Sequence, residues 1–258
     1  MNRLFFTRLA LSLCFIAAFA GCQTRPPAAA ARHPTYVLVH GAWSGGWDWR
    51  RVDELLTADG NKVYRVTLTG QGERSHLTGT NIDLDTHITD VVNIILWEHL
   101  HDVVLVGHSY GGMVITGVAD RVPDRLRHVI YVDAFLPTNG ESANTAIRPG
   151  APLPMTNDFV YPIGMKRPLP PFREVPMPAR TFSEPIVLTN QAVAQKLPTT
   201  YILLSATNRP PQQAMFYRFA QRAQARGWPV WTLQSDHNVQ RSHPGELVRL
   251  LEKAASQD

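Results

Sequence analysis

The stretch Val-Val-Leu-Val-Gly-His-Ser-Tyr-Gly-Gly-Met, residues 103–113, decides the fold of this chain. Its four apolar residues, 103–106, are typical of a strand buried on both faces of a parallel sheet. Residues 107–111 follow the pattern Gly-x-Ser-x-Gly, and an apolar helix is predicted at 113–121. The pattern also occurs by chance, but between a strand and a helix it predicts a sharp turn that projects a serine hydroxyl above the sheet. Ser109 is therefore the candidate nucleophile.

Strands and helices alternate on both sides of this turn. Further short apolar runs predict strands at 36–39, 63–66, 129–132, 201–204 and 230–233. Helical spacing of apolar residues predicts helices at 47–59, 84–100, 212–226 and 245–255. Repeated units of this kind imply an α/β domain with a mostly parallel sheet of about six strands and helices on both faces. Chemistry in such sheets lies beyond the C-terminal ends of the strands.

The alternation is interrupted by a proline-rich segment, residues 137–198. Proline at this density prevents long helices and central strands. A structureless loop of this length is unusual inside a compact domain. We therefore predict a lid insertion at 137–198 that packs over a domain spanning 35–258.

The N-terminal residues 1–21 predict an export signal. Arg3 and Arg8 flank the start of an apolar run, residues 9–20. This run is too short to cross a bilayer. Small residues at 18 and 20 fit ordinary signal cleavage, and a bacterial lipoprotein box ending at a lipidated Cys22 is the alternative. We favour the lipoprotein because a Pro/Ala-rich tether, residues 22–34, follows the cysteine. We therefore expect the protein to be exported, either to the bacterial periplasm or as a membrane-anchored lipoprotein. Ordinary signal cleavage would give a secreted form.

Composition limits the classes of partner. The 258 residues are 44% hydrophobic and 18% charged, which is typical of a globular domain. The net charge of +4 comes from scattered arginines rather than a basic stripe, so nucleic-acid binding is not expected. Cys14 lies within the signal, so no internal disulfide is expected, and no Cys or His cluster has metal-site spacing. We expect no cofactor and no metal, and the oligomeric state is left open.

A serine hydroxyl needs a proton acceptor, and His237 is the candidate base. It follows the last predicted strand and precedes the final helix, which brings it over the same sheet edge as Ser109. Of the other histidines, His40 and His108 lie beside the catalytic loops, and His243 is interpreted as structural or surface. The remaining six are interpreted as surface or helix residues: His33, His76, His87, His99, His101 and His128.

The third member of a triad is a carboxylate that orients the histidine. The strand 201–204 is followed by Ser-Ala-Thr-Asn-Arg, which contains no carboxylate. Asp133 follows the strand 129–132 and is our candidate; its alternative role is to cap the start of the lid. Asp236, beside the histidine, and Glu184, in the lid, are weaker candidates.

The loop after the first strand predicts an oxyanion hole. Acyl transfer needs two backbone N–H groups aimed where negative charge develops. Tyr110, after the candidate nucleophile, supplies one, and Ala42 in the loop His-Gly-Ala-Trp supplies the other. Gly41 allows close approach of the backbone. Trp43 is predicted to wall the acyl pocket.

Four stretches resemble one family: HGAWSGGWDWRRV (40–52), TLTGQGERSHLTGTNIDLDTHITDVVNII (67–95), VVLVGHSYGGMVITGVADRVPDRL (103–126) and SDHN (235–238). They are similar to the α/β-hydrolase family that contains plant hydroxynitrile lyases, plant methyl esterases and bacterial esterase relatives. The resemblance covers most of residues 35–254 and is weakest in the lid. It implies the α/β-hydrolase fold and the same roles for Ser109, His237, Ala42 and Tyr110.

The departures from this family are informative. Plant members carry an Asp after the penultimate strand, where this chain has Ser205-Ala-Thr-Asn. The lyases place a Thr where this chain has Gly41 and a Lys where it has Asn238, and those groups hold the cyanohydrin. Their absence favours ester hydrolysis over cyanohydrin cleavage.

The sequence therefore predicts a serine hydrolase that cleaves small carboxylic esters through an acyl-enzyme. The alternatives are a hydroxynitrile-lyase-like or amide- or lactone-cleaving enzyme on the same triad, or a catalytically silent ligand-binding protein. Apolar lid residues are candidates to line the pocket or to form the core of the lid: Phe159, Met165, Phe172 and Phe182.

Overall fold

The computed structural model describes residues 33–147, 153–162, 174–206 and 215–257. The predicted export signal, Cys22 and most of the tether lie outside the described residues, as do Met165 and Phe172. Within the described part, no helix combines the length and apolarity needed to cross a membrane.

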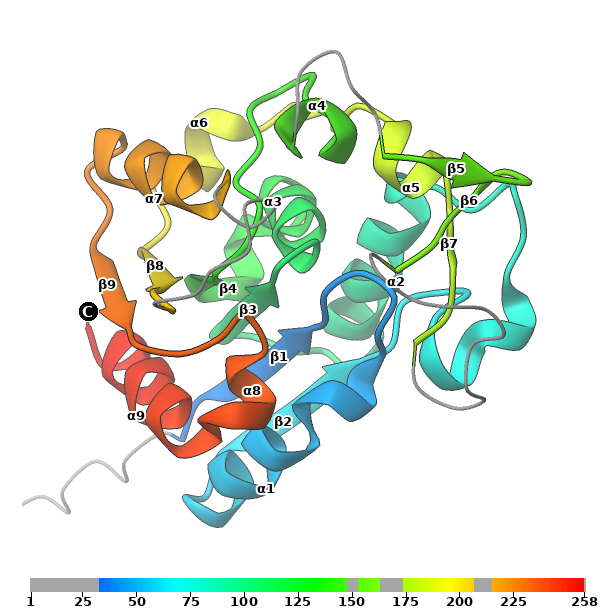
Figure 1. The fold of residues 1–258 in the computed structure, drawn as a ribbon. Coiled ribbons are helices and arrows are strands. Elements are labelled where there is room, and N and C mark those ends of the chain that lie inside the picture. Colours follow the sequence, from blue (N-terminus) through cyan, green and yellow to red (C-terminus); the bar gives the residue numbers. More distant parts are fainter. Residues whose placement is uncertain (1–32, 148–152, 163–173, 207–214, 258) are drawn as a thin grey trace, which may run out of the picture. The chain divides into compact units, whose positions relative to one another are not determined.

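The centre of the domain is a six-stranded sheet in the order β2-β1-β3-β4-β8-β9 (Figure 1). Its strands are β1 (Thr35–Val39), β2 (Lys62–Val66), β3 (Val103–His108), β4 (Leu126–Val132), β8 (Thr199–Leu204) and β9 (Val230–Leu233). Every neighbouring pair of these described strands runs parallel, which confirms the predicted architecture. All six C-terminal ends therefore meet at one edge of the sheet.

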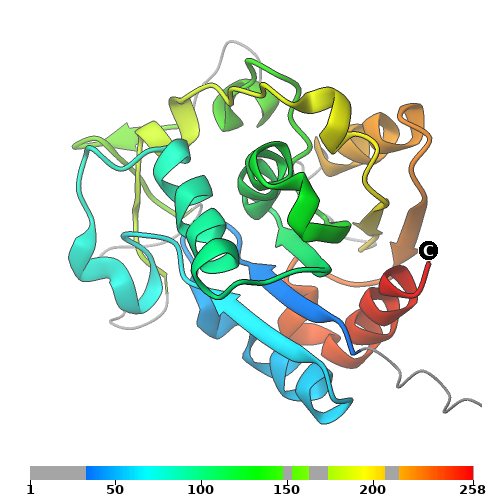
Figure 2. The same cartoon turned by 180° about the vertical axis from the view of Figure 1, so that it is seen from behind.

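Helices cover both faces of the sheet, as the alternating elements predict (Figures 1 and 2). One face carries α1 (Arg50–Ala58), α8 (Val239–Ser242) and α9 (Pro244–Ala255). The other carries α2 (Leu84–Trp97), α3 (Gly111–Arg121) and α7 (Met215–Ala225). Alternate residues of each strand enter separate cores: Tyr36 and Leu38 face α1 and α9, whereas Val37 and Val39 face α2 and α3. Short 3-10 turns, η1 (Gly46–Trp49), η2 (Gly72–Leu77) and η3 (Pro123–Arg125), complete the loops.

The proline-rich segment folds into short elements. They are α4 (Ala143–Ile147), β5 (Met155–Thr156), β6 (Phe159–Val160), β7 (Met177–Pro178), α5 (Arg180–Ser183) and α6 (Gln191–Ala194). The three strands form a small antiparallel sheet with β7 at its edge, where proline is tolerated. None of these described helices exceeds five residues, in keeping with the proline content.

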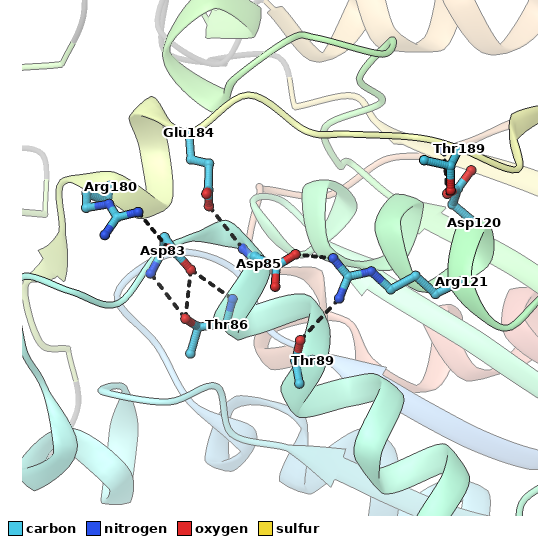
Figure 3. A network of polar contacts seen from close by, with 9 residues as sticks. All are labelled: Asp83, Asp85, Thr86, Thr89, Asp120, Arg121, Arg180, Glu184 and Thr189. Atoms are coloured by element: carbon cyan, nitrogen blue, oxygen red, sulfur yellow. Dashed lines mark hydrogen bonds and ion pairs between the residues drawn. The ribbon is translucent and has the colours of Figure 1, made fainter.

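A polar network fastens the proline-rich segment to α2 and α3 (Figure 3). The Arg180 guanidinium donates to the Asp83 carboxylate at 2.9 Å, and the Glu184 carboxylate accepts the N–H of Asp85 at 3.1 Å. On α3, the buried Asp120 accepts the N–H of Thr189 at 2.8 Å. The proline-rich segment is therefore held at the N-terminus of α2 and near the C-terminus of α3.

Asp83 serves both this network and its own helix. Its carboxylate accepts the N–H of Thr86 at 3.0 Å in a capping box at the start of α2. We expect Asp83→Ala to lower the free energy of unfolding by about 1 kcal/mol, since both the cap and the ion pair are lost. Asp83→Asn keeps a capping oxygen and should stay within about 0.5 kcal/mol of wild type. Urea unfolding of the two variants checks this, and equal losses would show that the cap contributes nothing.

Candidate active site

Ser109 lies on the turn between β3 and α3, with a backbone φ of +55°. Such a conformation is costly for a residue with a side chain, and surrounding contacts must hold it. The Ser109 carbonyl accepts the N–H of Phe135 at 2.9 Å. A Cβ at Gly111 would lie 2.8 Å from the carbonyl oxygen of Val39, and one at Gly107 would lie 2.8 Å from the Ile115 side chain. Both glycines of the pattern are therefore required by close packing.

Three candidate residues meet through their side chains. The Ser109 Oγ lies 2.9 Å from Nε2 of His237, and Nδ1 of the same ring lies 2.7 Å from Oδ2 of Asp133. One neutral tautomer satisfies both contacts, because Nδ1–H donates to the carboxylate while Nε2 accepts from the serine hydroxyl. The Asp133 side chain is fully buried and that of His237 is 15% exposed. The arrangement can accept and return a proton at the serine oxygen.

The strand register explains how Asp133 comes close to this site. His108 pairs with Val132 across β3 and β4, so Ser109 and Asp133 leave neighbouring strands at the same level. Asp133 has a φ of +42°, and its N–H donates to the carbonyl of Ile202 at 2.7 Å. Its Oδ1 accepts the N–H of Leu204 at 3.2 Å. Contacts with β8 therefore leave Oδ2 directed at the histidine.

The other candidate carboxylates lie elsewhere. The Asp236 carboxylate accepts the N–H of Asn238 at 2.7 Å, within its own loop. The Glu184 carboxylate accepts from the N-terminus of α2. Ser205 and Ala206 follow β8 as the sequence shows, and residues 207–214 lie outside the described part of the chain. Within that part, Asp133 is the carboxylate at hydrogen-bonding distance from the His237 ring.

Two aromatic rings pack against His237. Phe216 from α7 stacks on the imidazole with ring centroids 4.8 Å apart, and His108 lies 4.6 Å away at a tilt. His108 also donates from Nε2 to the His237 carbonyl at 2.7 Å, so it holds the loop as well as the ring. Burial, with His237 close by, lowers the pKa of His108 to about 3, which keeps it neutral. The sequence placed His108 near the site but gave no signal for Phe216.

A buried polar network supports His108 from behind. The Gln240 amide lies 3.5 Å from Nδ1 of His108 and donates to the Asp48 carboxylate at 2.8 Å. Asp48 also accepts from the Ser44 hydroxyl and from Arg241. The network joins the loop after β1 to the segment after His237.

The loop after β1 lies against the nucleophile. A Cβ at Gly41 would be 3.0 Å from the Ser109 Cβ, so the backbone passes as closely as glycine permits. Among the described residues, neither the Ala42 nor the Tyr110 N–H donates a hydrogen bond. The Trp43 N–H, in contrast, donates to the Met177 sulfur at 3.2 Å. Within the described residues, the two predicted oxyanion donors therefore have no acceptor.

Aromatic residues surround this loop. Trp43 has a φ of +65°, stacks on Phe182 at 5.9 Å and donates from its indole to the Val160 carbonyl at 3.0 Å. Phe182 in turn packs against the Tyr110 ring at 5.4 Å. Phe159 lines a separate hollow of about 270 Å³.

Two of the histidines interpreted as surface or helix residues are buried. His87 does lie in a helix, whereas for His128, which lies in a strand, the interpretation is wrong. His87 is fully buried in α2, where Nδ1 accepts from the Tyr110 hydroxyl and Nε2 donates to the Thr69 carbonyl. His128 is 3% exposed in β4, and its Nε2 lies 2.9 Å from the Thr200 hydroxyl. Both find polar partners on neighbouring elements, which sequence spacing does not reveal.

The buried histidines should lower the stability of the folded protein at acid pH. Burial lowers the pKa of His87 and of His128 to about 4, while His108 falls to about 3. The unfolded chain therefore binds protons below pH 6.5 that the folded chain does not, and stability falls as the pH drops from about 6.5 toward about 4. We expect urea unfolding to show a loss of about 2 kcal/mol from His128 between pH 7 and pH 5, with His87 and His108 lowering the free energy of unfolding further.

A matched variant isolates one of these contributions. His128→Gln places an amide where Nε2 contacts the Thr200 hydroxyl and removes the titrating group. The loss of stability between pH 7 and pH 5 should shrink by about 2 kcal/mol. An unchanged pH dependence would show that His128 does not stay neutral in the folded protein.

No metal site is evident in the part of the chain that the structure describes: no group of three or more His, Cys, Asp or Glu residues there could hold an ion. The site around Ser109 itself offers a hydroxyl, an imidazole and a carboxylate, with two backbone N–H groups beside them.

Comparison with known proteins places the chain in a family. The Alpha/beta hydrolase family matches residues 36–250. A carbendazim hydrolyzing esterase from Nocardioides sp. (strain SG-4G) is 37% identical, over 84% of this chain and 97% of that protein. A pheophorbidase from Raphanus sativus is 27% identical, over 86% of this chain and 94% of that protein.

Solved structures share the fold. A methylesterase from Arabidopsis aligns with a TM-score of 0.64 and 26% identity, covering 86% of this chain and 99% of its own. A pyrethroid hydrolase from Sphingobium faniae JZ-2 aligns with a TM-score of 0.66 and 23% identity, covering 87% and 98%. The family match over residues 36–250 includes most of β1, the turn at Ser109 and the loop that carries His237. The chain belongs to the alpha/beta hydrolase family.

Proposed function

We propose that this protein is a carboxylic-ester hydrolase that works through an acyl-enzyme on Ser109. The observation that carries the proposal is the continuous chain of contacts from the Ser109 Oγ through the His237 ring to Asp133, at 2.9 and 2.7 Å. Nucleophile, base and orienting carboxylate at hydrogen-bonding distance form the arrangement that activates a hydroxyl near neutral pH.

Acylation begins when Ser109 Oγ attacks the carbonyl carbon of the ester while Nε2 of His237 takes its proton. The resulting oxyanion accepts from the N–H groups of Ala42 and Tyr110, which have no acceptor among the described residues. The C–O bond then breaks, and His237 returns the proton to the departing alcohol. The N-terminus of α3, directly behind Ser109, adds positive potential.

Deacylation repeats these steps with water. His237 takes a proton from water as the water oxygen attacks the acyl carbon, and the same two N–H groups hold the second oxyanion. Collapse of this intermediate returns the proton to Ser109 Oγ and releases the carboxylic acid. Asp133 keeps Nδ1 protonated throughout, so that Nε2 faces the serine.

Relatives support ester cleavage in particular. The most similar relative described above is a carbendazim hydrolyzing esterase, and a methylesterase shares the fold. Cyanohydrin cleavage is the alternative on the same triad, and Gly41 argues against it. This residue offers no hydroxyl, and a Cβ there would press on the Ser109 Cβ at 3.0 Å.

A substrate panel tests the proposal. The purified protein should hydrolyse p-nitrophenyl esters of graded acyl length, and should act far more slowly on the matching p-nitroanilides and on mandelonitrile. Release of cyanide from mandelonitrile at rates above ester hydrolysis would favour the lyase. Inactivity toward every ester and amide, without covalent labelling of Ser109, would favour a silent ligand-binding protein.

A further inference from the structure

His40, which none of the catalytic steps above employs, is buried at the end of β1 with 1% of its surface exposed. Both of its ring nitrogens are engaged. Nδ1 lies 2.7 Å from the carbonyl oxygen of Gly41, and Nε2 lies 3.1 Å from the backbone nitrogen of Leu68. The Leu68 N–H can only donate, so Nε2 is the acceptor and Nδ1 carries the proton. The Nδ1–H of His40 therefore donates to Gly41.

The carbonyl that receives this hydrogen bond belongs to the same peptide unit as the Ala42 N–H. The six atoms of a trans peptide lie in one plane, and its C=O and N–H point in opposite directions. Fixing the direction of the Gly41 carbonyl therefore fixes the direction of the Ala42 N–H. The next N–H of the loop, from Trp43, already donates a hydrogen bond to the Met177 sulfur.

The order of the strands shows in which direction this peptide points. Val39 pairs with Val66 of β2 on one side and with Gly107 of β3 on the other. Leu68 therefore lies on the β2 side of the loop and Ser109 on the β3 side. The His40 ring reaches toward Leu68, so the Gly41 carbonyl is turned to the β2 side. The Ala42 N–H is then turned to the β3 side, where a Cβ at Gly41 would lie 3.0 Å from the Ser109 Cβ.

We propose that His40 is a positioning residue of the oxyanion hole: its Nδ1–H holds the Gly41–Ala42 peptide so that the Ala42 N–H points at the developing oxyanion. The inference rests on the proposed esterase function. It assigns a role to the histidine that precedes the glycine of this loop, which acts through the backbone and does not touch the substrate.

The surroundings of His40 keep its ring neutral and protonated on Nδ1. Burial lowers the pKa of His40, against weaker raising effects from the Gly41 carbonyl and from Asp48, Glu73 and Asp90. The neutral ring has one proton, and the Leu68 N–H directs that proton to Nδ1. A donor is therefore always presented to Gly41 near neutral pH.

Two substitutions separate this role from a purely structural one. The amide nitrogen of Asn occupies the place of Nδ1, so His40→Asn keeps a donor for the Gly41 carbonyl and loses the acceptor for Leu68. His40→Gln reaches the place of Nε2, so it keeps an acceptor for Leu68 and loses the donor. Each variant gives up one buried hydrogen bond, so the two should lose similar stability in urea unfolding.

Their activities should differ. Removing one donor from an oxyanion hole lowers kcat by about 100- to 1,000-fold. A donor that remains but points in the wrong direction should lower kcat by a smaller factor. We expect His40→Gln to lower kcat on a p-nitrophenyl ester by about 10- to 100-fold with KM within about twofold, and His40→Asn to stay within about threefold of wild type. A trifluoromethyl ketone, which forms a tetrahedral oxyanion on serine, should bind His40→Gln more weakly by the same factor.

Equal losses of kcat in the two variants, or a loss confined to KM, would overturn the proposal. If neither variant folds, ¹⁵N NMR of the wild-type protein with the trifluoromethyl ketone bound decides it, because the proposal requires His40 to be protonated on Nδ1. Protonation on Nε2 would contradict it. A wild-type protein that neither hydrolyses esters nor is labelled at Ser109 refutes the esterase function itself, which is a different outcome.

Discussion

Ser109→Ala is expected to lower kcat for ester hydrolysis by about 10⁵- to 10⁶-fold, the largest effect of any single substitution. The alanine removes the atom that forms the acyl bond, and the remaining hole and base cannot replace it. Alanine and serine are similarly strained at a positive φ. The substitution therefore adds no new backbone strain at +55°, and the fold should persist. Steady-state assays at high enzyme concentration, with circular dichroism to confirm folding, measure the effect.

Ser256 provides a matched control. It lies exposed beyond α9, and its hydroxyl donates to the Lys253 carbonyl. Ser256→Ala should leave kcat within about twofold of wild type, as for other surface changes. If Ser109→Ala retained more than about 1% of the activity while folded, a nucleophilic role for Ser109 would be ruled out.

Asp133→Asn should lower kcat by about 10⁴-fold, the second largest effect. The amide oxygen of the asparagine can still accept the Leu204 N–H, as Oδ1 of Asp133 does at 3.2 Å. Its NH₂ group then faces Nδ1 of His237 and donates to it. The ring must carry its proton on Nε2, where it can no longer accept from Ser109. The wrong tautomer explains the loss without any change of fold.

The comparison with Asp236→Asn makes this prediction specific. Asp236 adjoins the histidine in sequence, but its carboxylate accepts the Asn238 N–H and an amide oxygen can do the same. Asp236→Asn should keep kcat within about twofold of wild type. Near-normal turnover in Asp133→Asn, combined with a large loss in Asp236→Asn, would assign the acid to Asp236 instead.

The sheet and the serine turn were predictable because their signals are local. Four apolar residues followed by Gly-x-Ser-x-Gly specify a buried strand and its turn within nine residues, 103–111. The position of Asp133 followed from parallel strands ending at one edge, and the register of β3 with β4 puts it beside Ser109. Some ends of predicted helices shifted: the helix expected at 84–100 ends at Trp97, and the one expected at 47–59 spans Arg50–Ala58.

The supports of the site depend on contacts between distant parts of the chain. Gln240 and Asp48 are 192 residues apart in sequence, and Phe216 reaches His237 from a different helix. No periodicity or motif marks such pairs, because tertiary packing alone brings them together. The small antiparallel sheet of the proline-rich segment was also not predictable, since its two-residue strands are too short to produce an alternating pattern.

The central claim is that Ser109 becomes covalently bound during turnover. Intact-protein mass spectrometry after treatment with a fluorophosphonate tests it most directly, since this reagent forms a stable adduct with an activated serine. We predict one adduct per chain, located on the peptide that contains Ser109, and none in Ser109→Ala. Absence of an adduct from the folded wild type, or its location on another residue, would contradict the account.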